Sequence, residues 1–306
     1  MNHIPDQSDF GDFVQTFQIE DLNIRGRLIR LDHAYNQAIH AHGYPPAIKK
    51  LIGETMVLAA ILASALKYDG VFTLQVQGDG PVSLIMADIT SDGGMRAYAK
   101  LKDGVAEDDI AGASIPQTLG AGHMAFTVDQ GPDTDRYQGI TELTGATLAE
   151  CAQNYFRQSE QIETAIAITA DPGDADAPKH AAGLMVQRLP AARDGEREEE
   201  DWRRAVVLMS SITSDELLNP GLTATKILYR LYHEDGIRLF EQRRLHHECR
   251  CSEERVSRTL RSFPREEIDE MAEDGLITVT CEFCRTDYVY DERRLDALYA
   301  DVADQS

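Results

Sequence analysis

Two pairs of cysteines near the C-terminus, Cys249-Arg250-Cys251 and Cys281-Glu282-Phe283-Cys284, decide how this sequence folds there. One Cys-x-x-Cys pair is weak evidence, but two close pairs can place four thiolates at the corners of a tetrahedron around one zinc ion. The pattern predicts one Zn²⁺ per chain, bound by Cys249, Cys251, Cys281 and Cys284. The alternative is a set of unrelated buried thiols, which the clustering disfavours.

A zinc ion held by four cysteines has two possible uses. It is most often purely structural, because metal binding supplies folding free energy on the order of 10–16 kcal/mol to small modules. Oxidation of the sulfurs would release the metal and unfold such a module. The spacing of Cys281 and Cys284 suits a disulfide, whereas a bond between Cys249 and Cys251 would be strained and easily reduced. The residues alone leave both uses open.

The residues around the cysteines form a small module, residues 241–306. Ser252 is a helix N-cap, and Glu253 and Glu254 in the first turn suit the helix dipole. Pro264 begins a second helix that ends at Gly275. Strands are expected over Leu276–Thr280 and Asp287–Tyr290. The expected buried side chains are Val256, Leu260, Phe263, Ile268 and Met271.

Residues 1–190 predict one α+β domain. A long helix from Pro45-Pro46 to about Lys67 is apolar almost all round and is expected at the centre. Val71–Gln77 and Val82–Asp88 alternate around Gly78-Asp79-Gly80-Pro81, which predicts a hairpin. Further expected elements are strands within Phe13–Leu31, at Met95–Leu101, His123–Val128, Ile162–Thr169 and Gly183–Leu189, and a helix at Thr147–Gln158.

Residues 191–240 differ in composition and predict a helical linker. Arg193–Arg204 holds ten charged residues out of twelve, which is typical of a solvated helix face. Helical patterns follow at Trp202–Ile212 and Thr223–Tyr232. The whole chain is thus expected to be an α+β protein with an N-terminal sheet-and-helix domain, this linker, and the C-terminal zinc-binding module.

Charge and composition exclude several functions. The 306 residues include 30 Lys or Arg and 52 Asp or Glu, for a net charge of −22, which repels nucleic acids and anionic membrane surfaces. The most apolar run, Met56–Leu66, is shorter than the about 20 residues of a membrane span. With no secretion signal at the N-terminus, we expect a cytoplasmic protein. Gly78-Asp79-Gly80 lacks the Lys-Ser/Thr of a nucleotide loop, and no catalytic triad can be assigned, so we expect no enzyme.

The chain resembles the heat-shock protein 33 family of redox-regulated bacterial chaperones. The resemblance rests on Cys249-Arg250-Cys251-Ser252-Glu253-Glu254-Arg255 and on Val279-Thr280-Cys281-Glu282-Phe283-Cys284, followed by Tyr288. It extends along almost the whole chain through Arg25-Gly26, Gly53-Glu54, Leu66-Lys67 with Gly70, the turn at Gln75, Gly78, Gly80 and Pro81, and Tyr155-Phe156-Arg157-Gln158-Ser159-Glu160-Gln161. His247 departs from the family, which usually has an aromatic residue there.

The resemblance implies a redox-controlled holdase. The reduced, zinc-bound form would be a poor chaperone. Oxidation would form the disulfides Cys249–Cys251 and Cys281–Cys284, expel zinc, and unfold the module and the linker. The exposed apolar surface would bind unfolding client proteins without ATP, and the active form would be a homodimer. The linker side chains expected to be buried in the folded state are Val206, Val207, Leu208, Met209, Ile212, Leu217, Leu218, Ile227, Leu228 and Leu231.

Two other function classes compete with this interpretation. One is a zinc-ribbon module that binds nucleic acid or a protein, of which the charge disfavours the first. The other is a thiol–disulfide enzyme, which needs a βαβ context that the sequence around Cys281 lacks. Without the resemblance, permanent packing of the linker helices would be the favoured interpretation. Cys151 is expected to be a buried, inert thiol. His246 and His247 are expected at the surface, with an influence on the metal as the alternative.

Overall fold

The computed structural model describes residues 10–106, 110–131, 134, 137–173, 179–190 and 195–303, and of residues 195, 196 and 301–303 only the backbone. The chain divides into two compact units, Met1–Glu248 and Cys249–Ser306. The residues that follow the predicted boundary after residue 190, and with them the start of the charged run, lie outside the described residues. The separation of a linker within the first unit stays a prediction.

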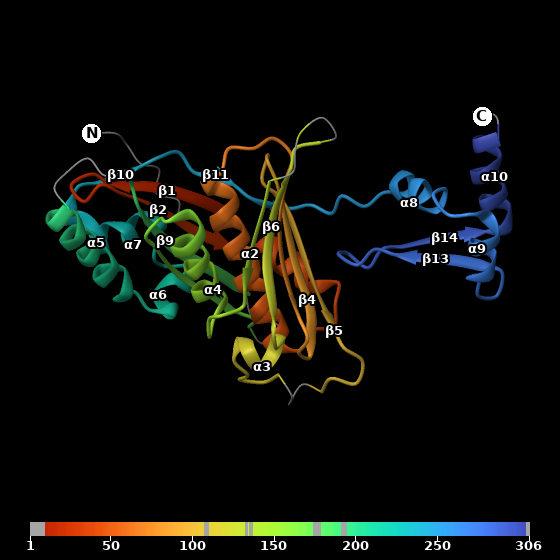
Figure 1. Cartoon of the computed structure of the whole chain (residues 1–306), viewed down its shortest axis with the longest axis horizontal. Helices are drawn as coiled ribbons and strands as arrows, with labels where there is room; N and C mark the ends of the chain where they lie inside the picture. Colours follow the sequence, from red (N-terminus) through yellow and green to blue (C-terminus); the bar gives the residue numbers. More distant parts are fainter. Residues whose placement is uncertain are drawn as a thin grey trace. The chain divides into compact units, whose positions relative to one another are not determined.

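The first unit contains two mainly antiparallel sheets with the helix α2 (Pro46–Ala65) between them (Figure 1). One sheet has the order β10-β1-β2-β9-β8, with β11 also pairing with β1; the other has the order β12-β5-β4-β3-β6-β7. The strands of the first sheet are β1 (Phe13–Ile19), β2 (Ile24–Leu31), β8 (Thr164–Asp171), β9 (His180–Arg188), β10 (Ile237–Leu239) and β11 (Arg243–Arg244). Those of the second are β3 (Val71–Gly78), β4 (Val82–Thr90), β5 (Gly94–Leu101), β6 (Gly122–Asp129), β7 (Tyr137–Glu142) and β12 (His246–His247).

The central helix and the β3–β4 hairpin are confirmed. Thirteen residues of α2 are buried, as expected for a helix that is apolar almost all round and contacts both sheets. The helix predicted at Thr147–Gln158 is only partly right. It is α4 (Leu148–Tyr155), which continues as a π-helical turn over Phe156–Glu160 and ends at Gln161 in the left-handed conformation. The sequence patterns missed α1 (His33–His40), α3 (Ile115–Leu119), β7 and the short strands β10, β11 and β12.

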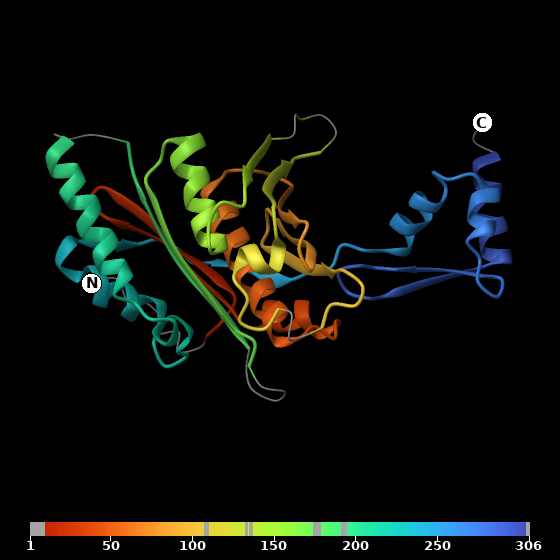
Figure 2. The ribbon, with the colours of Figure 1, turned by 60° about the horizontal axis from the view of Figure 1, so that its bottom comes forward.

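Three helices cover the face of the first sheet that is opposite to α2. They are α5 (Gly195–Ser210), α6 (Ser214–Leu218) and α7 (Ala224–Tyr232), followed by a 3₁₀ turn over His233–Asp235. Figure 2 shows this sheet between α5–α7 on one side and α2 and α4 on the other. The apolar residues between the three helices and the sheet form a second core, separate from that around α2.

The second unit is a helical pair with a two-stranded sheet and a terminal helix. Its elements are α8 (Glu253–Leu260), α9 (Arg265–Glu270), β13 (Leu276–Thr280), β14 (Asp287–Asp291) and α10 (Glu292–Ala303), the last of which was not predicted. Its small core is formed by Leu260, Ile268, Ile277, Tyr290, Leu295 and Leu298. The prediction that Phe263 and Met271 are buried is wrong. Phe263 is 44% exposed because α8 has already ended, and Met271 is 58% exposed because it lies at the C-cap of a short helix.

Among the described residues, no helix combines the length and the apolar character that crossing a bilayer requires.

Gly26 illustrates how the second core is built. It is the register partner of Phe17 across β1 and β2, and a Cβ added to Gly26 would lie 2.0 Å from the Phe17 ring. The absent side chain lets the ring lie on the sheet, where it stacks on Tyr232 of α7 with centroids 6.0 Å apart. Phe17 and Tyr232 are fully buried as a result.

Replacement of Gly26 by Ala should therefore lower the free energy of unfolding by about 1–3 kcal/mol, because the added methyl group overpacks the core. Urea unfolding monitored by circular dichroism measures the change. Gly43→Ala is the matched control, since nothing lies within 4 Å of its added Cβ. Equal stability of the two variants would contradict this account of Gly26.

Candidate metal centre

The four cysteines of the second unit lie at the ends of its regular elements. Cys249 and Cys251 precede α8, whose first turn is fixed by the Ser252 hydroxyl accepting a hydrogen bond from the Arg255 amide at 3.2 Å. Arg255 also donates to the Arg250 carbonyl at 2.8 Å, which holds the Cys-x-Cys segment against its own helix. The predicted N-cap is confirmed.

The second pair occupies the turn between β13 and β14. The Cys281 amide donates to the Thr286 carbonyl at 2.9 Å, and the Arg285 amide donates to the Cys281 carbonyl at 2.8 Å. Arg285 takes a positive φ of 59°, which closes the turn. The antiparallel pairing of Thr280 with Asp287 thus brings Cys281 and Cys284 to the same end of the two strands.

The four sulfurs converge on a common centre. The Sγ–Sγ distances are 3.4 Å for Cys249–Cys251, 3.7 Å for Cys249–Cys281 and 3.4 Å for Cys251–Cys284, and all four sulfurs lie within 4.8 Å of one another. A tetrahedral Zn–S₄ site with bonds of about 2.3 Å has sulfur–sulfur edges of about 3.8 Å. A disulfide is far shorter, about 2.05 Å. The arrangement therefore fits four thiols around one metal ion.

Electrostatics explains why this cluster favours a cation. Burial is the largest influence on the thiols and raises the pKa of Cys249, Cys251 and Cys281. Burial opposes ionisation of Cys284 as well, but hydrogen bonds from Thr286 and the neighbouring thiols lower its pKa to about 6. Four thiolates at this spacing would repel one another strongly, so a bound divalent cation is needed to hold all four ionised.

The other predicted sulfur and imidazole groups lie elsewhere. Cys151 is fully buried in the first unit, where the Gly145 amide donates to its sulfur at 3.3 Å and burial raises its pKa. The prediction of a buried thiol is confirmed. His246 is exposed, and His247 is half-buried with its pKa lowered by burial. Neither histidine belongs to the four-sulfur cluster.

The helices α5–α7 form the second feature of functional interest. Of the ten apolar side chains predicted to be buried there, Met209, Leu217, Ile227 and Leu228 are buried and Val206, Leu208, Ile212, Leu218 and Leu231 are partly buried. The prediction that Val207 is buried is wrong, because its side chain is 63% exposed on the outer side of α5.

Arg30 anchors the C-terminal end of α6 and was not identified from the sequence. Its guanidinium donates to the carbonyls of Leu217 and Asn219, at 3.0 and 3.2 Å, at the C-terminal end of α6. The side chain is 1% exposed and lies 4.4 Å from the centroid of the Phe10 ring. Burial lowers the pKa of Arg30 to about 10. The available signal was an arginine between two apolar residues, Ile29 and Leu31, in a strand that also holds Arg25 and Arg27.

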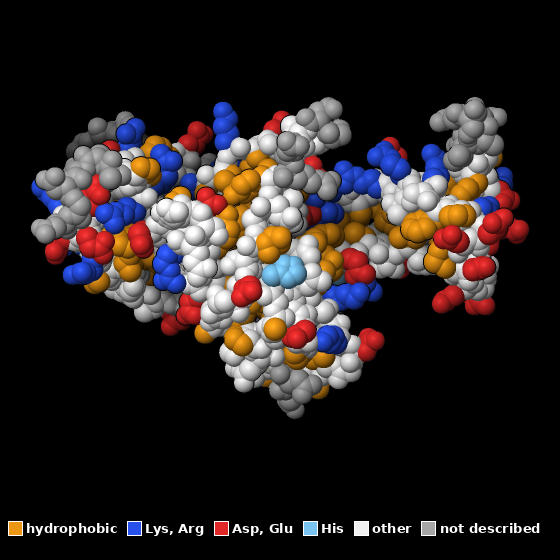
Figure 3. All heavy atoms as spheres, in the orientation of Figure 1, with side chains coloured by type: hydrophobic (Ala, Val, Ile, Leu, Met, Phe, Trp, Pro, Cys, Tyr) orange, Lys and Arg blue, Asp and Glu red, His pale blue; other side chains and the backbone are white. Residues whose placement is uncertain are grey.

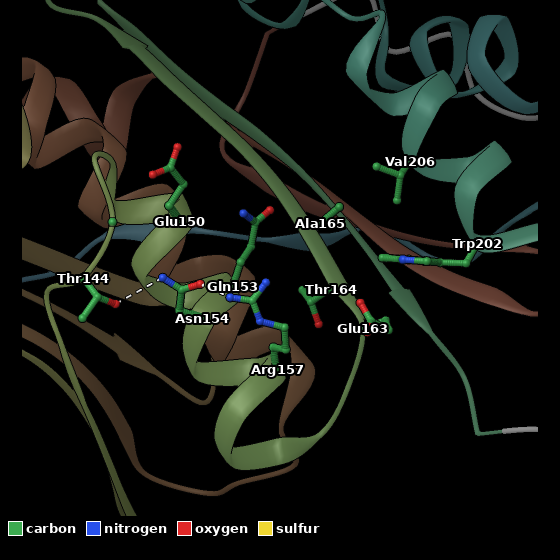
Figure 4. Close-up of a pocket in the computed structure, with 11 residues that line it drawn as sticks. Thr144, Glu150, Gln153, Asn154, Arg157, Glu163, Thr164, Ala165, Trp202 and Val206 are labelled. Atoms are coloured by element: carbon green, nitrogen blue, oxygen red, sulfur yellow. Dashed lines mark hydrogen bonds between the residues drawn. The ribbon is translucent and has the colours of Figure 1, made fainter. Parts of the chain in front are cut away.

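A cavity interrupts the packing of α5 on one side. It has a volume of about 450 Å³ and lies between α4, the edge strand β8 and α5 (Figure 4). Trp202 and Val206 form the α5 wall, and Asn154 and Arg157 face them from the side of α4. Asn154 donates to the Thr144 hydroxyl at 3.2 Å and accepts from Arg157 at 2.7 Å. The cavity leaves the side of α5 that carries Trp202 and Val206 only partly buried.

Comparison with known proteins agrees with this arrangement. The family model described as "Hsp33 protein" matches residues 12–291. The "33 kDa chaperonin" of Caulobacter vibrioides is 38% identical over 297 residues, covering 94% of this chain and 97% of that protein. The chain belongs to the Hsp33 family. The "33 kDa chaperonin" of Shewanella loihica is also 38% identical, over 290 residues, with coverages of 94% and 96%.

A solved Hsp33 homologue has the same fold. The crystal structure of the 33 kDa chaperonin from Thermotoga maritima superimposes with a TM-score of 0.81 at 23% identity, covering 96% of this chain and 99% of that one. The mixed helix-and-sheet class predicted from the sequence is confirmed. Membership of the Hsp33 family makes the chain a chaperone, and the family gives it client proteins as partners.

Loss of a group that only supports a metal ligand lowers metal affinity roughly 10–100-fold. Replacement of Cys281 by Ser removes one of four converging ligands, so it should lower the affinity for Zn²⁺ by more than that. Atomic absorption after dialysis in reductant measures the metal content per chain. Cys151→Ser removes a sulfur outside the cluster and should leave the metal content unchanged. Full zinc occupancy of Cys281→Ser at limiting metal would refute the ligand assignment.

Proposed function

We propose that this chain is a redox-regulated, ATP-independent holdase whose reduced, zinc-bound form is inactive and whose oxidised form binds unfolding proteins. The observation that carries the proposal is the convergence of four thiols on one centre in a unit with a very small core. An all-sulfur donor set at these distances suits zinc, which we propose as the one metal ion per chain, with Cys249, Cys251, Cys281 and Cys284 as ligands.

The proposed switch is oxidation of these sulfurs. Two disulfides would form, Cys249–Cys251 and Cys281–Cys284, as the family resemblance suggests. Four thiolates give four electrons to two molecules of peroxide, which take up four protons and leave as four waters. Disulfide sulfurs are poor ligands, so the four cysteines no longer bind the ion. The Cys249 and Cys251 sulfurs are already 3.4 Å apart and need a small movement to bond.

Loss of the metal should unfold the second unit, because six buried side chains provide little stability on their own. The segment Arg243–Glu248 runs directly into the first cysteine, so the chain connects the switch to the first unit. We propose that α5–α7, the predicted linker, then leave the sheet. Their departure would expose Phe17, Ile19, Leu28, Leu184 and Val186, which are now buried beneath them.

The packing of α5–α7 on the first sheet suits helices that we propose to leave it. The apolar contacts and Arg30 hold α6 and α7, but α5 borders a cavity on one side. Its polar ties to other elements include the ion pairs of Arg188 with Glu198 and Glu199, and of Arg204 with Glu234 and Asp235, in which the Glu198 and Asp235 carboxylates are buried. The two pairs with exposed carboxylates, those of Glu199 and Glu234, contribute about 0–1 kcal/mol each. Clients would bind the uncovered apolar surface, and we propose that the oxidised form is a homodimer.

The competing function classes have less support. Cys281 and Cys284 lie in a turn between antiparallel strands, whereas a thioredoxin-like enzyme places Cys-x-x-Cys in a βαβ context. Residues 249–306 contain 8 Arg and 15 Asp or Glu, a net charge of −7, and acidic side chains gather over α9 and α10 (Figure 3). That charge disfavours nucleic acid as the partner of a zinc ribbon. A zinc site of four thiolates needs a reducing compartment, which supports the cytoplasm as the location that we propose.

Peroxide with mild heat should release one zinc per chain and turn the protein into a suppressor of aggregation. Released zinc is measured with a chromogenic chelator, free thiols by titration, and activity by light scattering of a thermally unfolding enzyme without ATP. The same heat treatment in reductant is the control. Zinc release and loss of four thiols with no gain of activity would reduce the site to a structural metal centre and sink the proposed switch.

A glutamate at position 228 should raise chaperone activity without oxidant. Leu228 is fully buried between α7 and the sheet, so Leu228→Glu places a charge in the second core and displaces the helices. We expect at least a several-fold gain in aggregation suppression and faster proteolysis within residues 195–232. Val207→Glu is the matched control, because Val207 belongs to the same helical segment but is exposed. Equal basal activity of the two variants would show that docking of the helices does not restrain the chaperone.

A further inference from the structure

A second group of metal-binding side chains lies in the first unit, away from any cysteine. Asp92 lies in the turn between β4 and β5, His246 in β12, and Glu248 follows β12. One ligand atom of each lies within 4.8 Å of the others, and His246 Nε2 is 3.6 Å from a Glu248 carboxylate oxygen. The sequence separates Asp92 from the other two by more than 150 residues, so the fold alone brings them together.

The backbone holds this group in place from both sides. The strand β12 runs parallel to β5, with His246 opposite Gly94. The His246 amide donates to the Gly93 carbonyl at 3.0 Å, and the Glu248 amide donates to the Met95 carbonyl at 2.9 Å. We call residues 243–248 the strap. Its side chains His246 and Glu248 are therefore held at the edge of the second sheet.

The carboxylates are positioned by their surroundings. A Cβ on Gly94 would lie 2.1 Å from Glu248 Oε2, so the glycine leaves the space that this carboxylate occupies. The Thr90 hydroxyl donates to the Asp92 carboxylate, and this hydrogen bond lowers the pKa of Asp92. Asp92 and Glu248 thus converge as two like charges on His246. Among the described residues, no Lys or Arg forms an ion pair with either carboxylate.

We propose that Asp92, His246 and Glu248 form a second metal site, which binds a divalent transition-metal ion such as Zn²⁺. One imidazole nitrogen and two carboxylate oxygens suit zinc, with water completing the coordination. Mg²⁺ and Ca²⁺ prefer oxygen ligands alone and should compete poorly. Because its ligands come from the β4–β5 turn and from the strap, the ion would cross-link β12 to β5 and hold the strap on the sheet. The site uses no cysteine, so it is independent of the proposed redox switch.

Calorimetric titration of Zn²⁺ into the reduced full-length chain, already loaded with one equivalent, tests the proposal. The unmodified chain should bind one equivalent more than His246→Ala or Asp92→Asn, and excess Mg²⁺ should not displace it. His40→Ala removes another exposed histidine of the same unit and should retain the extra equivalent. Asp92→Asn keeps the size of the native side chain, so its loss of binding cannot be assigned to unfolding.

Hydrogen exchange supplies a second readout. Added Zn²⁺ should slow exchange of the His246 and Glu248 amides at least several-fold in the unmodified chain and leave them unchanged in Asp92→Asn. The proposal is overturned if the unmodified chain takes up no extra equivalent, if both variants still bind it, or if it binds without protecting β12. None of these outcomes bears on zinc release by oxidant, which tests the cysteine cluster alone.

Discussion

Repulsion between four sulfurs is the constraint on which the second unit depends. The sulfurs approach to 3.4–3.7 Å, a spacing that neutral thiols tolerate and four thiolates tolerate only around a cation. Besides the sulfurs, the small core and the contacts of Tyr290 and Arg294 with Glu253 hold the start of α8 near β14 and α10. In the proposed switch, the charge state of the sulfurs would control the fold of the unit, because oxidation would remove the charges that the cation balances.

The helices α5–α7 differ in how tightly they pack on the first sheet. Near α6 and α7 the contacts are strong, since Arg30 satisfies two carbonyls and Phe17 stacks on Tyr232 above Gly26. Along α5 they are interrupted, because a cavity borders Trp202 and Val206 while Ala205 and Met209 remain buried. Low local stability is a general property of segments that move in function. The side of α5 that borders the cavity is where separation of the helices from the sheet costs least.

Local patterns made much of this structure predictable. The Ser252 cap, the strands around Cys281 and Cys284, the β3–β4 hairpin and α2 all depend on residues close in sequence. The failures have physical causes. Periodicity placed Met271 and Val207 inward, but a helix end and an outer face turned them to solvent. The two-residue strands β11 and β12 carry no period of their own, and exist because distant strands offer free edges. Arg30 gained its role from carbonyls 187 and 189 residues away.

The strap lies between the two sheets of the first unit and the first cysteine of the second unit. Arg243 and Arg244 pair with β1 in one sheet, and His246 and His247 pair with β5 in the other, so a six-residue segment joins the two sheets of the first unit. Leu245 between them is buried in the core around α2. The next residue after Glu248 is Cys249. In the proposed mechanism, a change at the cysteines would reach the first unit along the chain through this segment, which backbone pairing holds on both sheets. A cation at Asp92, His246 and Glu248 would add a third hold, at the end of the strap that is nearest in sequence to the sulfur ligands.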